Sequence, residues 1–375
     1  MNAQEGKTYD LLCIGMALVD SIIRGFDPEP VSASGFRAES GTLNVGGEAV
    51  NEAMAAAKLG LRTGILCALA DDAAGDMVRS AMERCGVDTG PLDKVAEAEA
   101  AEAVAAAGGS ISGGVSAPAG GSLPAPGSHS TPVTTMFVNA DGSRKSITNS
   151  AHRYNFHPEK YPEIIRQSRA VTLGSLFRAP FDDPEVIRGV VSAAKESGAI
   201  VLADTKLPNF RRLTMEDIKD ILPLIDYIFP NEDEARYYTS PEGRGIECGG
   251  ELTPEEMARV FLDYGVKNVI IKLGAKGCLF MSERETIRLD ALDIRAVDAT
   301  GAGDNFLAGF AAAKLGDPSF GAPEQNGCRT GPGSGGISDE YALRFGNACG
   351  AICTTAVGAA TALRNREQVE EMLQG

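Results

Sequence analysis

Short apolar segments alternate with helix-like segments along most of this 375-residue chain, and this alternation limits the folds open to it. The strand-like segments include "RTGILCALA" (62–70) and the later runs "AVTLGS", "AIVLADT", "YIFPN" and "NVIIKLG". We expect a first strand over residues 9–20, "YDLLCIGMALVD", and a helix over residues 46–60. Strands that alternate with helices form a mostly parallel sheet covered on both faces. The chain is therefore expected to be an α/β protein with three layers, α/β/α.

The overall composition argues against several classes of function. A hydrophobic fraction of 43% and a charged fraction of 23% are ordinary for a soluble globular protein. The formal net charge of −16 argues against nucleic-acid or anionic-membrane binding, although a local glycine turn can still hold a nucleotide. No segment approaches the ~18 apolar residues of a membrane helix, and the N-terminus lacks a secretory signal pattern. The eight cysteines form no CxxC pair, so a reducing cytoplasm is the expected location.

Some segments depart from the alternation. Residues 31–45 and 131–148 are typical of β-hairpins, the second with a "DG" turn, and we expect them to form a small β-sheet lid over the strand ends. In residues 105–130, Ala, Gly, Ser and Pro make up 22 of 26 residues, which is too poor in large apolar groups for a packed core. That stretch and residues 316–339 are interpreted as low-complexity insertions. The expected main α/β domain then comprises residues 1–30, 46–104 and 149–375.

The segment "VDATGAGDNFLAGF", residues 297–310, places two glycines before an acidic residue where a strand-like run becomes a helix. The free N–H groups and dipole of a helix start suit a bound anion. Asp304 directly follows this anion site. Taken alone, the pattern also fits a tight strand-to-helix turn in which Asp304 favours the helix N-terminus. Its chemical meaning depends on what lies beside it.

Polar residues and glycines also follow other predicted strands. Asp20, Asp204, Asn231 and Gly274 all lie at or just after strand ends, where the ligands of such sheets bind. The sequence motifs of several other classes of enzyme are absent. The chain has no GxxxxGK[ST], GxSxG or HExxH pattern, and "GAGDNF" lacks the third glycine of GxGxxG. Cys349 and Cys353 are four residues apart, but two sulfurs are too few for a zinc site.

The combination of motifs resembles the ribokinase-like (PfkB) carbohydrate kinases. The resemblance runs from about residue 9 to residue 365 and includes "GMALVD", "NVGGEAVNEAMAAAKLG", "PNEDEA", "KLGAKG", "VDATGAGDNFLAGF" and "RFGNACGAICTTAVGA". Ala299 departs from the residues usual before the Thr of "TGAGD". The resemblance implies a ribokinase-like fold with a β lid. It also implies a kinase that uses ATP and Mg²⁺.

The resemblance also implies roles for the residues in and around the motif "GAGD". It makes Asp304 the general base for the sugar hydroxyl, beside backbone amides of Gly301, Ala302 and Gly303 that hold the transferred phosphoryl group. Phosphoryl transfer depends on positioning and charge stabilisation, which explains why a base lies beside an anion site. The residues that match the sugar ligands of the family are Asp20, Gly46, Gly47 and Asn51.

The nucleotide and metal ligands are implied in the same way. Asn231 and Glu234 match the residues that organise Mg²⁺, partly through water, with Asp204 assisting and Lys206 near phosphate. Residues matching the nucleotide side are Asn231, Lys272, Gly274, Gly277 and Asn347, the last near the adenine. A monovalent-cation loop, with K⁺ as the candidate ion, is implied at Asp298, Thr300, Cys353, Ala356 and Gly358.

The function expected from these residues is ATP-dependent phosphorylation of a hydroxymethyl group on a small sugar or sugar acid. Two alternatives remain open: a nucleoside kinase of the same family, and a catalytically silent sugar-binding regulatory member. The sequence does not identify the sugar. A homodimer through the lid is also expected, with apolar contacts from Val133, Met136, Val138 and Ile147.

Overall fold

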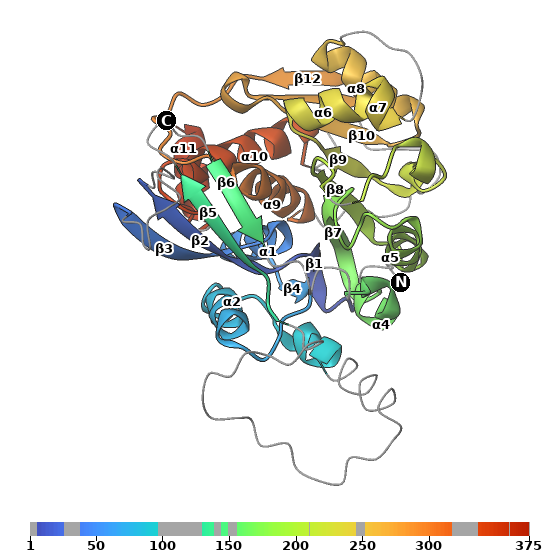
Figure 1. The fold of residues 1–375 in the computed structure, drawn as a ribbon. Coiled ribbons are helices and arrows are strands. Elements are labelled where there is room, and N and C mark those ends of the chain that lie inside the picture. Colours follow the sequence, from blue (N-terminus) through green and yellow to red (C-terminus); the bar gives the residue numbers. More distant parts are fainter. Residues whose placement is uncertain are drawn as a thin grey trace, which may run out of the picture.

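The fold is built on one eight-stranded sheet, seen in the computed structural model of the chain (Figure 1). The structure describes residues 6–25, 38–96, 130–138, 144–148, 156–209, 211–244, 252–316, 337–359 and 361–374. The strand order is β12-β11-β10-β9-β8-β7-β1-β4. Neighbouring strands from β4 to β10 are parallel, whereas β11 and β12 are added antiparallel. The strands are β1 (Tyr9–Gly15), β4 (Thr63–Leu66), β7 (Ser168–Leu176), β8 (Ile200–Thr205), β9 (Tyr227–Phe229), β10 (Asn268–Lys272), β11 (Cys278–Ser282) and β12 (Thr286–Leu289).

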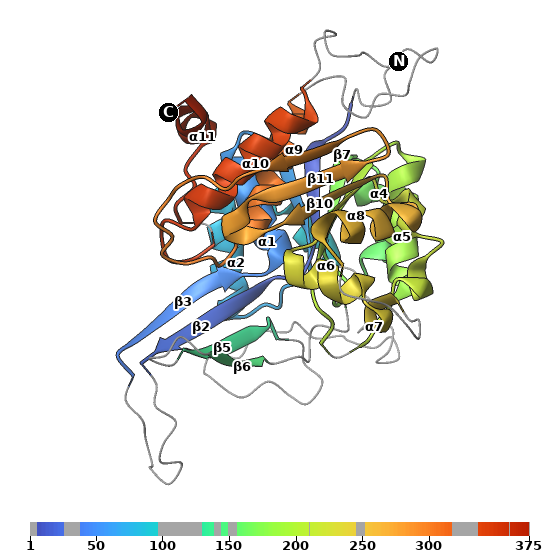
Figure 2. The same ribbon diagram turned by 90° about the horizontal axis from the view of Figure 1, so that it is seen from above.

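Helices cover both faces of this sheet, which confirms the expected three-layer arrangement (Figure 2). One face carries α1 (Glu48–Lys58), α2 (Ala73–Arg84), α9 (Ala302–Leu315), α10 (Asp339–Cys353) and α11 (Arg366–Gln374). The other face carries α4 (Pro162–Ile165), α5 (Pro184–Glu196), α6 (Glu232–Thr239), α7 (Pro241–Arg244) and α8 (Pro254–Asp263). Short 3₁₀ helices lie at Pro158–Lys160, Glu216–Ile218, Leu222–Leu224 and Gly274–Lys276.

Each face of the sheet has its own apolar core, and the core beneath α9 bears most directly on function. Phe306, Leu307 and Phe310 of α9 are buried against β-strand residues such as Phe229. The Phe310 ring lies 5.4 Å from the Phe229 ring, at an interplanar angle of 71°. Because α9 packs along its length against the sheet and α10, the start of this helix is held rigidly at the carboxyl edge of the sheet.

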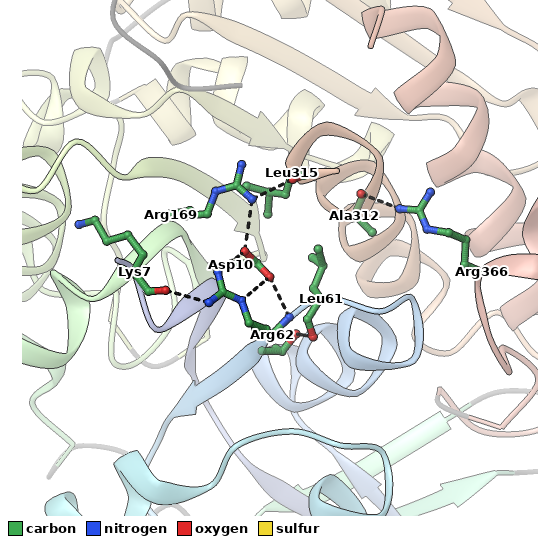
Figure 3. Close-up of polar contacts among 9 residues, drawn as sticks. Lys7, Asp10, Leu61, Arg62, Arg169, Ala312, Leu315 and Arg366 are labelled. Atoms are coloured by element: carbon green, nitrogen blue, oxygen red, sulfur yellow. Dashed lines mark hydrogen bonds and ion pairs between the residues drawn. The ribbon is translucent and has the colours of Figure 1, made fainter. Parts of the chain in front are cut away.

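The C-terminal end of α9 is held by two arginines from distant elements (Figure 3). Arg169, at the start of β7, donates through Nη1 to the carbonyl of Leu315 at 2.9 Å and to Asp10 Oδ1 at 3.2 Å. Arg366, at the start of α11, donates to the carbonyl of Ala312 at 2.9 Å. The last carbonyls of a helix lack intrahelical partners and carry the negative end of its dipole, so both contacts stabilise α9.

A second, four-stranded sheet projects beside the carboxyl edge of the main sheet (Figure 2). This small sheet has the order β3-β2-β5-β6, formed by β2 (Leu18–Arg24), β3 (Ser40–Gly46), β5 (Val133–Val138) and β6 (Arg144–Thr148). The expectation of one strand over residues 9–20 is wrong, because β1 ends at Gly15 and β2 pairs in the small sheet. The chain changes sheets at Met16 and Ala17, within an unbroken apolar run.

Several expectations fall on residues outside this description. They concern residues 26–30 of the expected main domain, residues 31–37 of the expected lid, the "DG" turn at 141–142, and nearly all of the insertions at 105–130 and 316–339. The division into a main domain and a lid therefore stays a proposal, in which residues 18–24 now move to the lid side. No helix within the described ranges is long and apolar enough to cross a membrane.

Candidate active site

The turn before α9 requires glycine. Gly301 has a φ of 75°, and a Cβ placed on it would lie 2.2 Å from the Cβ of Ala359. A Cβ on Gly303 would lie 2.9 Å from Lys272 Nζ, so the ammonium group sits directly against this turn. The Ala302 N–H donates to the carbonyl of Ala299 at 3.2 Å. The helix start thus presents an ammonium group and the Gly303 amide side by side, which suits a phosphoryl anion.

Asp304 lies in the first turn of α9 and is buried, with 5% of its surface exposed. Asn51 of α1 donates through Nδ2 to Asp304 Oδ2 at 2.7 Å. Burial raises the pKa of Asp304 to about 6, with Asp204 and Glu48 adding to the rise and Lys206 opposing it. A carboxyl group whose pKa lies near neutrality, held by an amide in a fixed direction, is suited to general-base chemistry.

Asp20 reaches the same region from the small sheet. A Cβ on Gly46 would lie 2.4 Å from Asp20 Oδ2, and a Cβ on Gly47 would lie 2.3 Å from the carbonyl of Met16. Gly47 has a φ of 102°, which also favours glycine. Burial raises the pKa of Asp20 to about 6, and Glu48 adds to the rise. The two glycines therefore let the small sheet, α1 and the Asp20 carboxyl approach one another closely.

Lys272 and Asp204 form a buried ion pair next to the α9 turn. Lys272, at the end of β10, donates to Asp204 Oδ1 at the end of β8 at 2.6 Å, and the side chains are 13% and 2% exposed. Burial alone would lower the pKa of Lys272, but the carboxylates of Asp204 and Glu234 outweigh burial and raise it. Lys272 therefore stays charged beside the Gly303 amide.

Asn231 and Glu234 form a reciprocal cap at the start of α6. Asn231 Oδ1 accepts from the Glu234 N–H at 2.9 Å, and Glu234 Oε2 accepts from the Asn231 N–H at 3.0 Å. Thr205 Oγ1 also donates to Glu234 Oε2, at 2.8 Å. Such a capping box explains the N-x-x-E spacing structurally. Burial raises the pKa of Glu234, whereas Lys272 lowers it.

The sequence reasoning missed two charged residues at this edge, Glu48 and Arg178. Lys206, after β8, lies with Nζ 3.5 Å from Oε1 of Glu48 at the start of α1. Burial would raise the pKa of Glu48, but Lys206 and then Arg178 lower it. Glu48 directly follows the glycine pair, so its position in "GGEAVN" was the available signal. Arg178 follows β7, and no sequence pattern marks it.

Three of the residues expected on the nucleotide side, Lys272, Gly274 and Gly277, lie where β10 leads into β11. Gly277 has a φ of 87°, and a Cβ on it would lie 1.9 Å from the carbonyl of Leu289. Gly274 has a φ of 58° and begins a short 3₁₀ turn. Asn347, on α10, donates through Nδ2 to the carbonyl of Asp290 at 2.8 Å. That bond links α10 to the segment after β12 and leaves the Asn347 carbonyl oxygen to other partners.

The residues expected to bind a monovalent cation also gather in one place. Asp298 Oδ1 accepts from the N–H and hydroxyl of Thr300 at 3.1 and 2.7 Å, and Asp298 Oδ2 accepts from the Gly358 N–H at 3.2 Å. The Cys353 thiol lies 3.4 Å from the carbonyl of Thr300. Ala356, half-buried, lies in the same loop as Gly358. The loop before α9 and the loop after α10 are thereby joined around Asp298.

The carboxylates at the sheet edge are suited to hold Mg²⁺ indirectly. In the described part of the chain, no group of three or more His, Cys, Asp or Glu side chains could hold a metal ion on its own. The oxygen donors at this edge, Asp204 and Glu234, instead fit an ion that keeps several waters and binds one or two carboxylates together with substrate phosphates.

Comparison with known proteins assigns the chain to a protein family. A model of the pfkB family carbohydrate kinases matches residues 10–110 and 122–366. The chain belongs to this family. Ribokinase from Haemophilus influenzae is 26% identical over 334 residues, which cover 88% of this chain and 87% of that protein. The chain is thus a carbohydrate kinase with the ribokinase fold.

Solved structures show the same fold. The structure of Arabidopsis thaliana ribokinase complexed with ribose and ATP has a TM-score of 0.72 at 23% identity, covering 98% of this chain and 99% of that chain. A nucleoside kinase from Methanocaldococcus jannaschii has a TM-score of 0.64 at 18% identity, covering 98% and 99%. Because PfkB kinases of different substrate class share this architecture, the fold alone does not select the substrate.

Proposed function

We propose that this PfkB kinase transfers the γ-phosphoryl group of ATP to a hydroxymethyl group of a small sugar or sugar acid, with Asp304 as the general base. The observation that carries this proposal is the juxtaposition at the start of α9. There the buried Asp304 carboxyl, oriented by Asn51, follows directly after the Gly303 amide and the Lys272 ammonium. In a carbohydrate kinase, a base and an anion site lie together where the acceptor hydroxyl meets the phosphoryl group.

Within this proposal, Asp20 and the close glycine pair hold the sugar hydroxyls, and the acceptor hydroxyl points at Asp304. The Asn51 bond occupies Oδ2 of Asp304, so Oδ1 takes the hydroxyl proton. The amides of the α9 turn and Lys272 stabilise the charge on the transferred group. Lys206, paired with Glu48 at 3.5 Å, also lies near the phosphates.

Two ions belong to this proposal. Mg²⁺, when bound with ATP, neutralises charge on the β- and γ-phosphates, and Asp204, Glu234 and Asn231 would hold it partly through water. K⁺ would occupy the loop around Asp298, whose carboxylate and neighbouring carbonyls supply oxygen ligands. The nucleotide would lie along Lys272, Gly274, Gly277 and Asn347.

The test is ADP release with Mg–ATP across pentoses, hexoses, sugar acids and nucleosides. Asp304→Asn keeps the size of the side chain and the capacity to bond Asn51 but cannot accept the proton. We expect kcat to fall about 100-fold or more, with little change in the KM for ATP. Near-normal turnover by the folded variant would reject Asp304 as the base. Turnover of nucleosides alone would favour the nucleoside-kinase alternative, and no turnover of any acceptor would favour the silent regulatory member.

A further inference from the structure

Arg178 presents an unused guanidinium edge at the sugar side of the site. Its Nε donates to the carbonyl of Leu207 at 2.7 Å. Within the described ranges, neither Nη atom of Arg178 has a hydrogen-bond or ion-pair partner. The side chain is half-buried. Placing a guanidinium in a partly desolvated position with two free donors is costly unless a ligand or water completes it.

The position of Arg178 is fixed by packing. Phe177, directly before it, has a φ of 73°, which is uncommon for a residue other than glycine. The Phe177 ring stacks on Tyr238 of α6, with ring centres 3.8 Å apart. The hydroxyl of Tyr238 donates to the carbonyl of Lys206 at 2.5 Å. Tyr238 therefore holds the segments after β7 and β8 together, and the backbone strain at Phe177 is the kind found at ligand sites.

The charges around Arg178 indicate what it can bind. Arg178 bonds the residue next to Lys206, and Lys206 Nζ lies 3.5 Å from Oε1 of Glu48. Glu48 in turn acts on the carboxyls of both Asp20 and Asp304, so this group borders the sugar site. Lys206 is engaged by Glu48 and also interacts with the carboxyls of Asp304, Asp204 and Glu234, so Arg178 is the cation of this group whose Nη atoms are left for a ligand.

We propose that Arg178 binds a carboxylate on the sugar and that the preferred substrates are sugar acids. The planar fork of an arginine matches a carboxylate through two parallel N–H···O bonds. The carboxyls of Asp20, Glu48 and Asp304 beside this site disfavour added negative charge, so a singly charged carboxylate fits better than a phosphate, which carries about −1.5 to −2 at pH 7. The reaction itself is the one proposed above.

Three acceptors that differ only at C1 test this inference: D-fructose, 2-keto-D-gluconate and D-fructose 1-phosphate. They carry a hydroxymethyl, a carboxylate and a phosphate group there, and each keeps the C6 hydroxymethyl group. ADP release with Mg–ATP gives kcat/KM for each acceptor. For the wild-type protein we expect kcat/KM for the carboxylate to exceed that for fructose by at least about 10-fold.

The variants separate binding of the carboxylate from a structural effect. Arg178→Met should lower kcat/KM for 2-keto-D-gluconate about 10- to 100-fold, mainly through a higher KM. The kcat/KM for fructose and the KM for ATP should be nearly unchanged. Arg178→Lys keeps the charge but loses the planar guanidinium. Its kcat/KM for 2-keto-D-gluconate should therefore lie between those of the wild type and Arg178→Met. Arg212→Met is the matched control, because Arg212 is exposed and bonds Glu242 away from Glu48 and Lys206.

Each contrary result has a distinct meaning. A wild-type preference for fructose, or an equal loss on all acceptors in Arg178→Met, would overturn the carboxylate site while leaving the kinase function intact. A preference for D-fructose 1-phosphate would replace the carboxylate by a phosphate and overturn the inference as stated. If the folded protein released no ADP with any acceptor in the wider panel, the proposed function itself would be rejected.

Discussion

The general-base role proposed for Asp304 would set function against stability at a single residue. Burial raises its pKa to about 6, so the ionised form that a base requires is the form that the folded protein disfavours. The pKa of the same residue type in an unfolded chain is about 3.9. Between these two values the folded state binds more protons than the unfolded state. Stability contributed by the neutral carboxyl is therefore lost as pH rises from about 4 to about 6.

Asp304→Asn should accordingly stabilise the protein at pH 8, where wild-type Asp304 is ionised, by on the order of 2 kcal/mol. The gain should shrink toward zero at pH 4, where the wild-type carboxyl is protonated. Urea unfolding at the two pH values measures both effects. The control is Asp183→Asn, because Arg211 holds the pKa of Asp183 below its usual range despite partial burial. That variant should lose stability at pH 8, and a gain there would contradict this account.

Site residues within a recognisable motif could be predicted, whereas those defined only by tertiary contacts could not. Asp304 and Asn51 are 253 positions apart and meet at 2.7 Å, which is consistent with the proposal that both face the sugar. Arg178 belongs to no motif, since its place depends on the stacking of Phe177 on Tyr238 and on the carbonyl of Leu207. Glu48 lies inside a motif, but its pairing with Lys206 depends on two strand ends that meet only in the folded sheet.

At the scale of the element, α9 links the anion site at its start to an arginine pair at its end. Arg169→Met removes a side chain that is 13% exposed and bonds both Leu315 and Asp10. We expect the free energy of unfolding to fall by about 1–3 kcal/mol, because a helix carbonyl and part of a buried carboxylate lose their partner. Urea unfolding measures the loss.

Arg62→Met is the matched control for Arg169→Met. Arg62 bonds the same carboxylate of Asp10 but is 60% exposed, so water replaces much of its contribution. The free energy of unfolding should fall less than for Arg169→Met. Equal losses for the two variants would show that the contact with α9 contributes nothing beyond the ion pair.

Periodicity could predict the elements of the main sheet but not the point where the chain leaves it. The apolar run "LLCIGMALV" gives no sign that Gly15 ends one strand and Leu18 begins another in a different sheet. Val19 near the start of β2 is buried like the residues of β1, because the base of the small sheet packs against α2. A strand that is buried on two sides has the same apolar pattern in either sheet.

At the scale of the whole molecule, the small sheet has one face toward the site, and its other face packs against α2 near the base but is exposed farther out. Directly paired residues share a face, so Leu43, Ser21, Thr135 and Ile147 form one row. Leu43 is 61% exposed and Ile147 is 69% exposed. Met136 and Val138 lie on the opposite face, with Asp20, so they are not candidates for contact between subunits.

We propose that this outer row packs against its copy in a homodimer. Ile147→Glu should then shift the protein to a monomer at micromolar concentration, because a buried carboxylate without a partner is strongly unfavourable. Light scattering measures the mass. Tyr341→Glu is the control, since Tyr341 is an exposed aromatic residue on α10, outside the small sheet. A wild-type monomer, or an Ile147→Glu variant that stays dimeric, would reject this interface.

The location of Asp20 has a kinetic consequence. Asp20 belongs to the small sheet and Asp304 to the main domain, and only Met16 and Ala17 separate β1 from β2. In the proposed complex, a sugar bound by both carboxyl groups therefore links the small sheet to the main domain. Tighter binding by Asp20 would slow dissociation of the phosphorylated product as well as of the sugar. Product release would then be the rate-limiting step of the cycle. Its rate would depend on movement of the small sheet, which takes no part in the phosphoryl transfer itself.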